Sequence, residues 1–239
     1  MAVACVPAAL PPAAAASLPP GSPADLSPKV DQMVVFRAGT EKARSVRARR
    51  VTVQVRGRRC VVARGTPLAA LVVSRVARLR MRDFGHCSRL QERDSASLFV
   101  SGIGPDLNAG QDGWTYKVGR KAGTTGAADP SGPFGHGRLR TGAHVLWFYC
   151  HLTGSSCQRT LSFTGVSTSS PGAVVVRVGA YNDDGRGIPA AGATVHVDRA
   201  SGVTGPDGAV KIAAGAGPHT MYAEQAGRVR TFPTRVVLR

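Results

Sequence analysis

Short runs that alternate apolar and polar residues recur along this chain and constrain its fold more than any other feature. "VTVQV" at 51–55 alternates with period two, and "RRCVVA" follows directly after Gly57. Such alternation predicts a strand with one buried face, and a glycine between two such runs is typical of a hairpin. Three more strand-like runs follow: "SLFVSGIG" (97–104), "GWTYKVG" (113–119) and "HVLWFYCH" (144–151).

One segment interrupts the strand pattern and predicts a helix. In "TPLAALVVSRVARL" (66–79), Thr66 can cap a helix, and Pro67 fits its first position, where the missing N–H costs nothing. The apolar stripe at helical spacing consists of Leu68, Leu71, Val72, Val76 and Leu79. We expect the stripe to pack on a sheet of the flanking strands. Two strands, a helix and three strands are the element order of a β-grasp domain.

The character of the sequence changes at residue 171. Short alternating runs such as "GAVVVRVGAY" and "GATVHVD" are divided by turns such as "NDDGRG" and "GPDG". Closely spaced strands with such turns indicate a small all-β sandwich. The predicted fold class is therefore α+β: a β-grasp-like domain, with a mixed sheet over one helix, followed by a small all-β sandwich.

The predicted division of the chain begins with a leader. The opening is apolar, rich in alanine and free of charge until Asp25, with an A-x-A-like site near 14–16, as in secretory signals. It lacks the usual positive start, and disordered low-complexity sequence is the alternative. The expected segments are a signal peptide (1–18), a low-complexity basic linker (19–49), a β-grasp domain (50–153), a linker (154–170) and a sandwich (171–239). The protein is expected to be secreted or to lie on the extracellular face of the cell envelope.

Four cysteines remain after such a leader, and an even number in an exported chain indicates disulfides. Three pairings are possible, and we favour Cys60–Cys87 with Cys150–Cys157 because these close the shortest loops. The chain-entropy model gives roughly 3.5 and 2.4 kcal/mol for the two loops, as upper values. Zinc is the alternative, but no pair has the C-x2–4-C spacing. We predict no metal site and no cofactor.

The formal net charge of +17 favours anionic partners. The most basic stretch, "RSVRARRVTVQVRGRR" (44–59), contains no aromatic residues that could stack on bases and matches no nucleic-acid-binding module. Anionic cell-envelope polymers are thus a candidate partner, and nucleic acid is not favoured. General surface basicity without a dedicated site is the other explanation. No run after the leader has the roughly 18 apolar residues of a membrane-spanning helix.

"GWTYKVG", a glycine-rich loop and "LRTGAHVLWFYC" resemble the family of domains related to the C-terminal domain of transcobalamin. The matching residues are Gly113, Trp114, Tyr116, Val118, Gly119, Gly142, Trp147 and Tyr149. The resemblance covers 51–151 and implies a soluble-ligand-binding β-grasp fold. In transcobalamin this domain covers one face of cobalamin; we do not carry this ligand over, because the family's second, helical domain has no counterpart here. The tail resembles immunoglobulin-like or prealbumin-like modules of bacterial surfaces.

Two short regions are the predicted ligand contacts. Residues i and i+2 of a strand face one side, so Trp114 and Tyr116 share a face, and Lys117 is expected to face solvent on the other. Loops longer than about 15 residues without secondary structure usually have a function. The loop at 120–141 is therefore predicted to contribute to the ligand site through Phe134 and His136. These five side chains are predicted to bind an unknown small molecule or peptide. The alternative is that the rings only fill the core.

No nucleophile–base set is visible in the sequence. G-x-S-x-G and H-E-x-x-H are absent, and His136 has no visible partner. Asp183 and Asp184 lie in a glycine-flanked turn, where solvated turn residues are favoured over a weak calcium site. We therefore predict a non-catalytic ligand-binding protein. The alternative is a structural or adhesive envelope component that its basic surface holds to anionic polymers.

Overall fold

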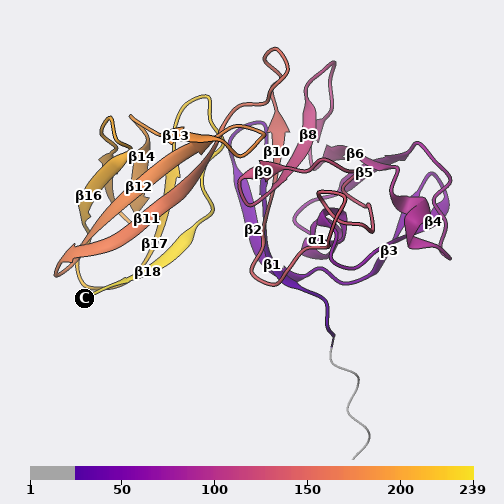
Figure 1. The fold of residues 1–239 in the computed structure, drawn as a ribbon, viewed down its shortest axis with the longest axis horizontal. Coiled ribbons are helices and arrows are strands. Elements are labelled where there is room, and N and C mark those ends of the chain that lie inside the picture. The colour runs from indigo at the N-terminus through magenta and orange to yellow at the C-terminus, as the bar shows by residue number, and fades with distance from the viewer. Residues whose placement is uncertain (1–24) are drawn as a thin grey trace, which may run out of the picture.

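The computed structural model describes residues 25–239, with the backbone only at 169 and 170, and it is mostly β: 49% strand and 6% helical (Figure 1). The predicted signal peptide at 1–18 lies outside the described residues. The strands form several small sheets rather than one mixed sheet with a helix laid across it. The predicted α+β fold with a β-grasp domain is therefore wrong.

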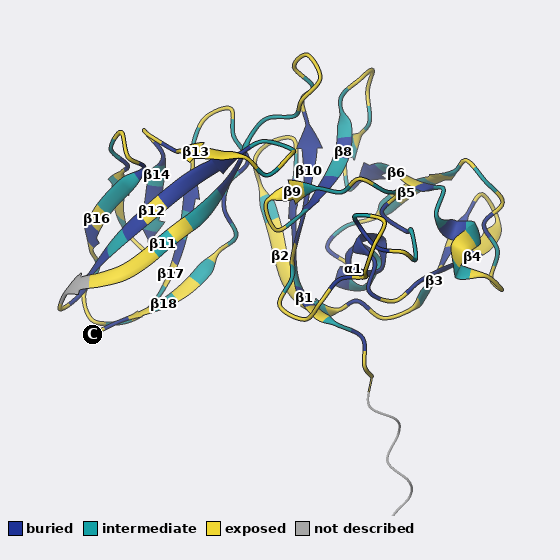
Figure 2. Ribbon diagram, viewed as in Figure 1, coloured by how far each residue is buried: buried dark blue, intermediate teal, exposed yellow. Residues whose placement is uncertain are grey.

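The largest sheet of the first half has the order β2–β1–β10–β8–β9. Its strands are β1 (Lys29–Val35), β2 (Glu41–Arg47), β8 (Gly113–Val118), β9 (Lys121–Ala122) and β10 (His144–Cys150). β1 runs parallel to β10, and the other pairs are antiparallel. Residues 145–150 are all buried, so this central strand is covered on both faces (Figure 2).

The other predicted strands of this half form two separate sheets. β3 (Val51–Val55) pairs with β4 (Arg58–Val62), and β5 (Leu79–Asp83), β6 (Leu98–Ile103) and β7 (Asp106–Leu107) form a three-stranded sheet. The β-grasp arrangement fails because β1 lies beside β10 and β2 forms the edge next to β1, so neither β3 nor β4 joins this sheet. β1 and β2 come from residues 29–47, which the sequence pattern assigned to a linker.

The helix α1 (Pro67–Ser74) is shorter than the predicted segment. The Thr66 hydroxyl accepts a hydrogen bond from the Ala69 N–H at 3.2 Å, so the predicted cap is confirmed. The helix ends because Arg75 adopts a left-handed conformation, with φ of 49°. Leu79 therefore leaves the apolar stripe and begins β5. α1 contacts parts of β1, β2 and β3 instead of crossing one sheet, and a short 3₁₀ helix, η1 (Glu92–Ser95), follows later.

The second half consists of two four-stranded antiparallel sheets. One contains β11 (Thr160–Ser170), β12 (Ala173–Tyr181), β13 (Gly187–Pro189) and β16 (Ala209–Ala213); the other contains β14 (Thr194–Val197), β15 (Ala200–Val203), β17 (Gly217–Glu224) and β18 (Thr234–Leu238). Buried residues of both sheets form one apolar cluster. β11 comes from the segment 154–170 that the sequence assigned to a linker.

The two halves share a third apolar cluster. Its buried members are Met33, Val35, Leu146, Phe148, Cys150 and Val229. The first five lie on β1 and β10, on the face of the sheet that points away from α1, and Val229 belongs to the connection between β17 and β18. The outer face of the five-stranded sheet is therefore covered by the second half.

Candidate functional site

Trp114 and Tyr116, two of the predicted ligand contacts, lie in the core of the first half. They are 6% and 7% exposed, in the same apolar cluster as α1 and Trp147. The Trp114 indole N–H donates to the Asp106 carbonyl at 3.0 Å, and the Tyr116 hydroxyl donates to the Thr125 carbonyl at 2.8 Å. The polar atom of each ring is thus already hydrogen-bonded to a backbone carbonyl of the protein. Burial raises the pKa of Tyr116 to about 12.

Gly123 is required where the long loop crosses the ring of Tyr116, because a Cβ on Gly123 would overlap the phenol. Gly123→Ala is expected to lower the free energy of unfolding by about 1–3 kcal/mol through overpacking. Urea denaturation of the full chain measures it. Gly165→Ala is the control, because its Cβ would only reach atoms of Arg177 at 3.8 Å. Equal losses in both variants would contradict close packing of the loop on Tyr116.

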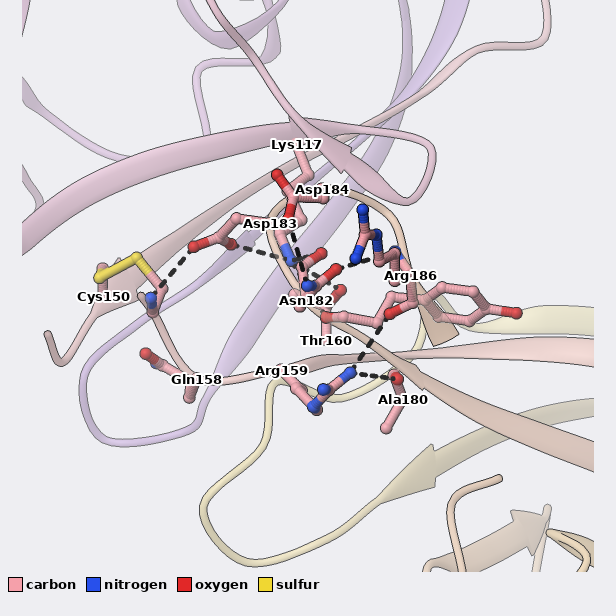
Figure 3. Close-up of polar contacts among 12 residues, drawn as sticks. Lys117, Cys150, Gln158, Arg159, Thr160, Ala180, Asn182, Asp183, Asp184 and Arg186 are labelled. Carbon is pink, nitrogen blue, oxygen red and sulfur yellow. Dashed lines mark hydrogen bonds and ion pairs between the residues drawn. A yellow bond between two sulfur atoms is a disulfide. The ribbon is translucent and has the colours of Figure 1, made fainter. Parts of the chain in front are cut away.

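Lys117, predicted to face solvent, is fully buried, so this prediction is wrong. Its Nζ donates to the carbonyls of Tyr181 at 3.2 Å and Asn182 at 2.9 Å, and it lies 3.1 Å from Asp183 Oδ1 (Figure 3). The reason is tertiary: the turn after β12 covers this face of β8. Burial lowers the pKa of Lys117, and the Asp183 carboxylate partly opposes that shift.

Phe134 and His136 line a pocket of about 310 Å³ between β8 and the 133–143 segment. Their ring centroids lie 6.5 Å apart, and the Lys121 Nζ lies 5.7 Å from the Phe134 ring. None of Trp114, Tyr116 or Lys117 lines this pocket. The structure therefore does not bring the five predicted contact residues together, and a binding role for Phe134 and His136 stays a prediction.

A pocket of about 380 Å³ lies where the two halves meet. Three segments far apart in sequence form it: the turn after β1 (36–39), the end of β10 with the following disulfide loop (148–158), and the connection at 227–229. We call it the junction pocket. Ligand sites are often found between parts of a chain, with volumes of roughly 300–1,000 Å³.

The turn after β1 is fixed by hydrogen bonds at its base and its tip. The Phe36 N–H donates to the Thr40 carbonyl at 2.8 Å, and the Arg37 N–H donates to Asp106 Oδ2 at 2.9 Å. Gly39 adopts φ of 82°, a conformation that favours glycine. These bonds hold Arg37 at the pocket, with its guanidinium 5.5 Å from the Tyr149 ring.

A disulfide and one amide side chain hold the second segment. The bridge Cys150–Cys157 closes the loop, as predicted, and Cys60–Cys87 is the other predicted bridge that the structure confirms. Gln158 accepts from the His151 N–H at 2.9 Å and donates to the Tyr149 carbonyl at 2.7 Å. Both ends of the loop are therefore attached to the end of β10.

His151 is oriented at the pocket by Asp112. Its Nδ1 lies 3.1 Å from Asp112 Oδ2, and the Leu152 N–H donates to Asp112 Oδ1 at 2.9 Å. These two contacts hold the pKa of the Asp112 carboxyl below its usual range. The imidazole is thus fixed beside the aromatic side of the pocket rather than free to rotate.

The third segment carries Arg228. The Val229 N–H donates to the Arg159 carbonyl at 3.0 Å, and the Leu161 N–H donates to the Val229 carbonyl at 2.7 Å, so the segment is fixed to the start of β11. The Arg228 Nη1 is buried and has no hydrogen-bond partner among the described residues. Arg228 therefore brings a positive charge to the pocket, and it forms no ion pair within the described residues.

Sequence reasoning missed Arg37, His151, Gln158 and Arg228. Arg37 stands in the segment assigned to a linker, and Arg228 stands in a region with no pattern of its own. The Cys150–Cys157 spacing was the one signal near the pocket, because a short disulfide loop after a central strand fixes the residues on both sides of it.

Comparison of the chain with protein-family models, with curated proteins and with solved structures gives no match. The likeness to transcobalamin-related domains therefore depends only on the residues quoted above. Within residues 25–239, no group of three or more His, Cys, Asp or Glu side chains is placed to hold a metal ion. In the same range, no helix has the length and apolar character needed to cross a membrane.

Proposed function

We propose that this chain is an exported, non-catalytic binding protein and that its junction pocket takes a small soluble ligand. The observation that carries the proposal is the construction of the pocket. Each of its three segments is fixed by its own hydrogen bonds, and its lining includes the aromatic residues Phe36, Phe148 and Tyr149, of which Phe36 is partly exposed. Pre-formed, largely apolar concavities with a few placed polar groups are typical of small-molecule sites.

Export is supported by cysteine chemistry. All four described cysteines are paired, in Cys60–Cys87 and Cys150–Cys157. Such bridges persist in oxidising compartments and are rare where thiols are kept reduced. The basic surface is compatible with either a secreted protein or one held at the cell envelope, and the proposal includes both.

A ligand screen with a pocket-filling variant tests the binding proposal. Small acids, amides and sugars are tested against the full chain by saturation-transfer NMR. Thr153→Trp adds a ring at an exposed position that lines the pocket, and Thr168→Trp adds the same ring on exposed β11. We expect saturable binding to the native chain and to the Thr168 variant, and its loss in the Thr153 variant. Binding that survives in both variants would place the ligand elsewhere and contradict the proposal.

A second candidate function has its own observation. The basic side chains of residues 42–59 are all exposed, namely Lys42, Arg44, Arg47, Arg49, Arg50, Arg56, Arg58 and Arg59. They lie on the edge strand β2, on the link to β3 and on the β3–β4 hairpin. This concentration of positive charge would attract an anionic envelope polymer. Release from intact cells by salt alone would favour this function, since salt screens exposed charges.

A further inference from the structure

The charge of the junction pocket indicates the class of its ligand, an inference that depends on the proposed function above. Two arginines, Arg37 and Arg228, line the pocket, and its lining includes no aspartate or glutamate. Neither guanidinium takes part in an ion pair among the described residues. The carboxylate beside the rim, Asp112, is already bonded to His151 and Leu152.

Arg228 is in an unfavourable environment when the pocket holds no anion. Its Nη1 is buried without an acceptor, and a buried donor that lacks a partner costs free energy. Burial and the nearby charge of Arg159 both lower the pKa of Arg228. Arg159 cannot supply the missing acceptor, because a guanidinium only donates, and its own donors go to the carbonyls of Ala180 and Arg186. A negative group in the pocket would oppose the lowering of the Arg228 pKa, because it would favour the charged guanidinium.

Lys117, which is fully buried, is a useful contrast. The Lys117 Nζ already has the carbonyls of Tyr181 and Asn182 and the carboxylate of Asp183 as partners. Its hydrogen-bonding capacity is used within the protein. Arg228 is only partly buried, lines a cavity and has no ion-pair partner among the described residues. The two cations therefore have different roles: Lys117 holds the halves together, and the charge of Arg228 is open to a ligand.

We propose that the junction pocket binds a small molecule with an oxyanion headgroup, a carboxylate or a phosphate, held by Arg228 and Arg37. The planar guanidinium fork matches both headgroups, since each offers two oxygens at the spacing of two N–H donors. Phe36, which lines the same pocket and is partly exposed, would contact an apolar or aromatic body. The ligand class is thus a small organic acid or phosphate ester.

Three probes of similar shape test the headgroup on the full chain: phenylacetate, phenyl phosphate and the neutral phenylacetamide. We expect the acids to bind at least about tenfold more tightly than the amide, because charge-assisted hydrogen bonds are the stronger kind. Titration calorimetry at low salt measures the three affinities. The order of phenylacetate and phenyl phosphate then distinguishes a carboxylate site from a phosphate site.

Arg228→Gln separates a ligand-binding role from a structural one. The variant is expected to bind both acids about tenfold more weakly, whereas its melting temperature without ligand stays unchanged or rises, because an unfavourable buried charge is removed. Arg199→Gln makes the same change of charge at an exposed position of the second half and should alter neither property. A lower melting temperature of the Arg228 variant would overturn the inference, because it would make Arg228 a structural residue.

The two proposals fail in distinguishable ways. If the amide binds as tightly as the acids, and Arg228→Gln changes nothing, the anion inference is wrong and the junction pocket remains a small-molecule site. If none of the three probes binds to the native chain, the anion inference is overturned and the proposed function loses its support too. Tight binding of the acids that Thr153→Trp removes and Thr168→Trp retains would support both.

Discussion

Replacing Asp183 with alanine is expected to lower the free energy of unfolding by about 3 kcal/mol. The substitution leaves the fully buried ammonium of Lys117 without its carboxylate, and breaking a buried ion pair on one side costs about 3–5 kcal/mol. We expect the lower end of that range, because the Asp183 side chain is 29% exposed and water can replace part of it. The Cys157 N–H, which donates to Asp183 Oδ2 at 3.1 Å, also loses its acceptor. Guanidinium denaturation of the full chain measures the loss.

Asp184→Ala is the matched control in the same turn. The Asp184 side chain is exposed, and its contact is a 3.5 Å hydrogen bond from the Asn182 amide. A loss within about 0.5 kcal/mol is expected for such an exposed position. Equal losses for the two aspartates would show that Asp183 does not compensate the charge of Lys117.

The cost of Asp183→Ala should depend on pH in a defined direction. Asp183 raises the pKa of Lys117, so its removal lowers that pKa further below the usual 10.5. At a pH below the pKa of Lys117 in the folded variant, the lysine is charged in the folded and unfolded states, and the variant bears the full cost. As the pH rises toward 10.5, the folded variant releases its proton before the unfolded chain does, and the cost decreases. The stability difference between the variant and the native chain should therefore narrow at high pH.

Short sequence patterns correctly predicted those structural elements whose formation depends mainly on residues close to them in sequence. The cap at Thr66 and the central strand β10 follow from short stretches of sequence, and the cysteine pairing follows from loop length. β2 could not be found in this way. Its sequence, "EKARSVR", is almost entirely polar and exposed, because it is an edge strand held by its pairing with β1. Its periodicity therefore carries no burial signal.

The error about Lys117 has a different physical origin. Alternation places Lys117 on the face of β8 opposite Tyr116, which is correct, but it does not show what covers that face. The turn at 181–183 covers it and supplies the polar partners that make burial of a lysine possible. The junction pocket is beyond local reasoning for the same reason, because its three segments meet only after both halves have folded.

Loss of the bridge Cys60–Cys87 is also expected to lower the free energy of unfolding strongly. β3 and β4 pair only with each other as a sheet, and a two-stranded hairpin is marginally stable alone. The bridge joins β4 to the segment after β5 across a sequence separation of 27 residues. Replacing both buried cysteines with alanine is expected to cost up to about 3.5 kcal/mol, by the loop-closure argument. Hydrogen exchange should accelerate first at 51–62, and guanidinium denaturation measures the total loss.

A variant without the bridge Cys150–Cys157 tests whether loss of stability and loss of ligand affinity can be separated. Cys150–Cys157 spans only seven residues, so its double alanine variant should lose less stability, up to about 2.4 kcal/mol. That loop is a wall of the junction pocket, whereas Cys60 and Cys87 line no part of it. The less destabilised variant should therefore be the one that binds phenylacetate more weakly, and the more destabilised Cys60–Cys87 variant should keep native affinity at temperatures where it is folded. If affinity instead decreased in proportion to stability across both variants, the loop would have no direct role in forming the pocket.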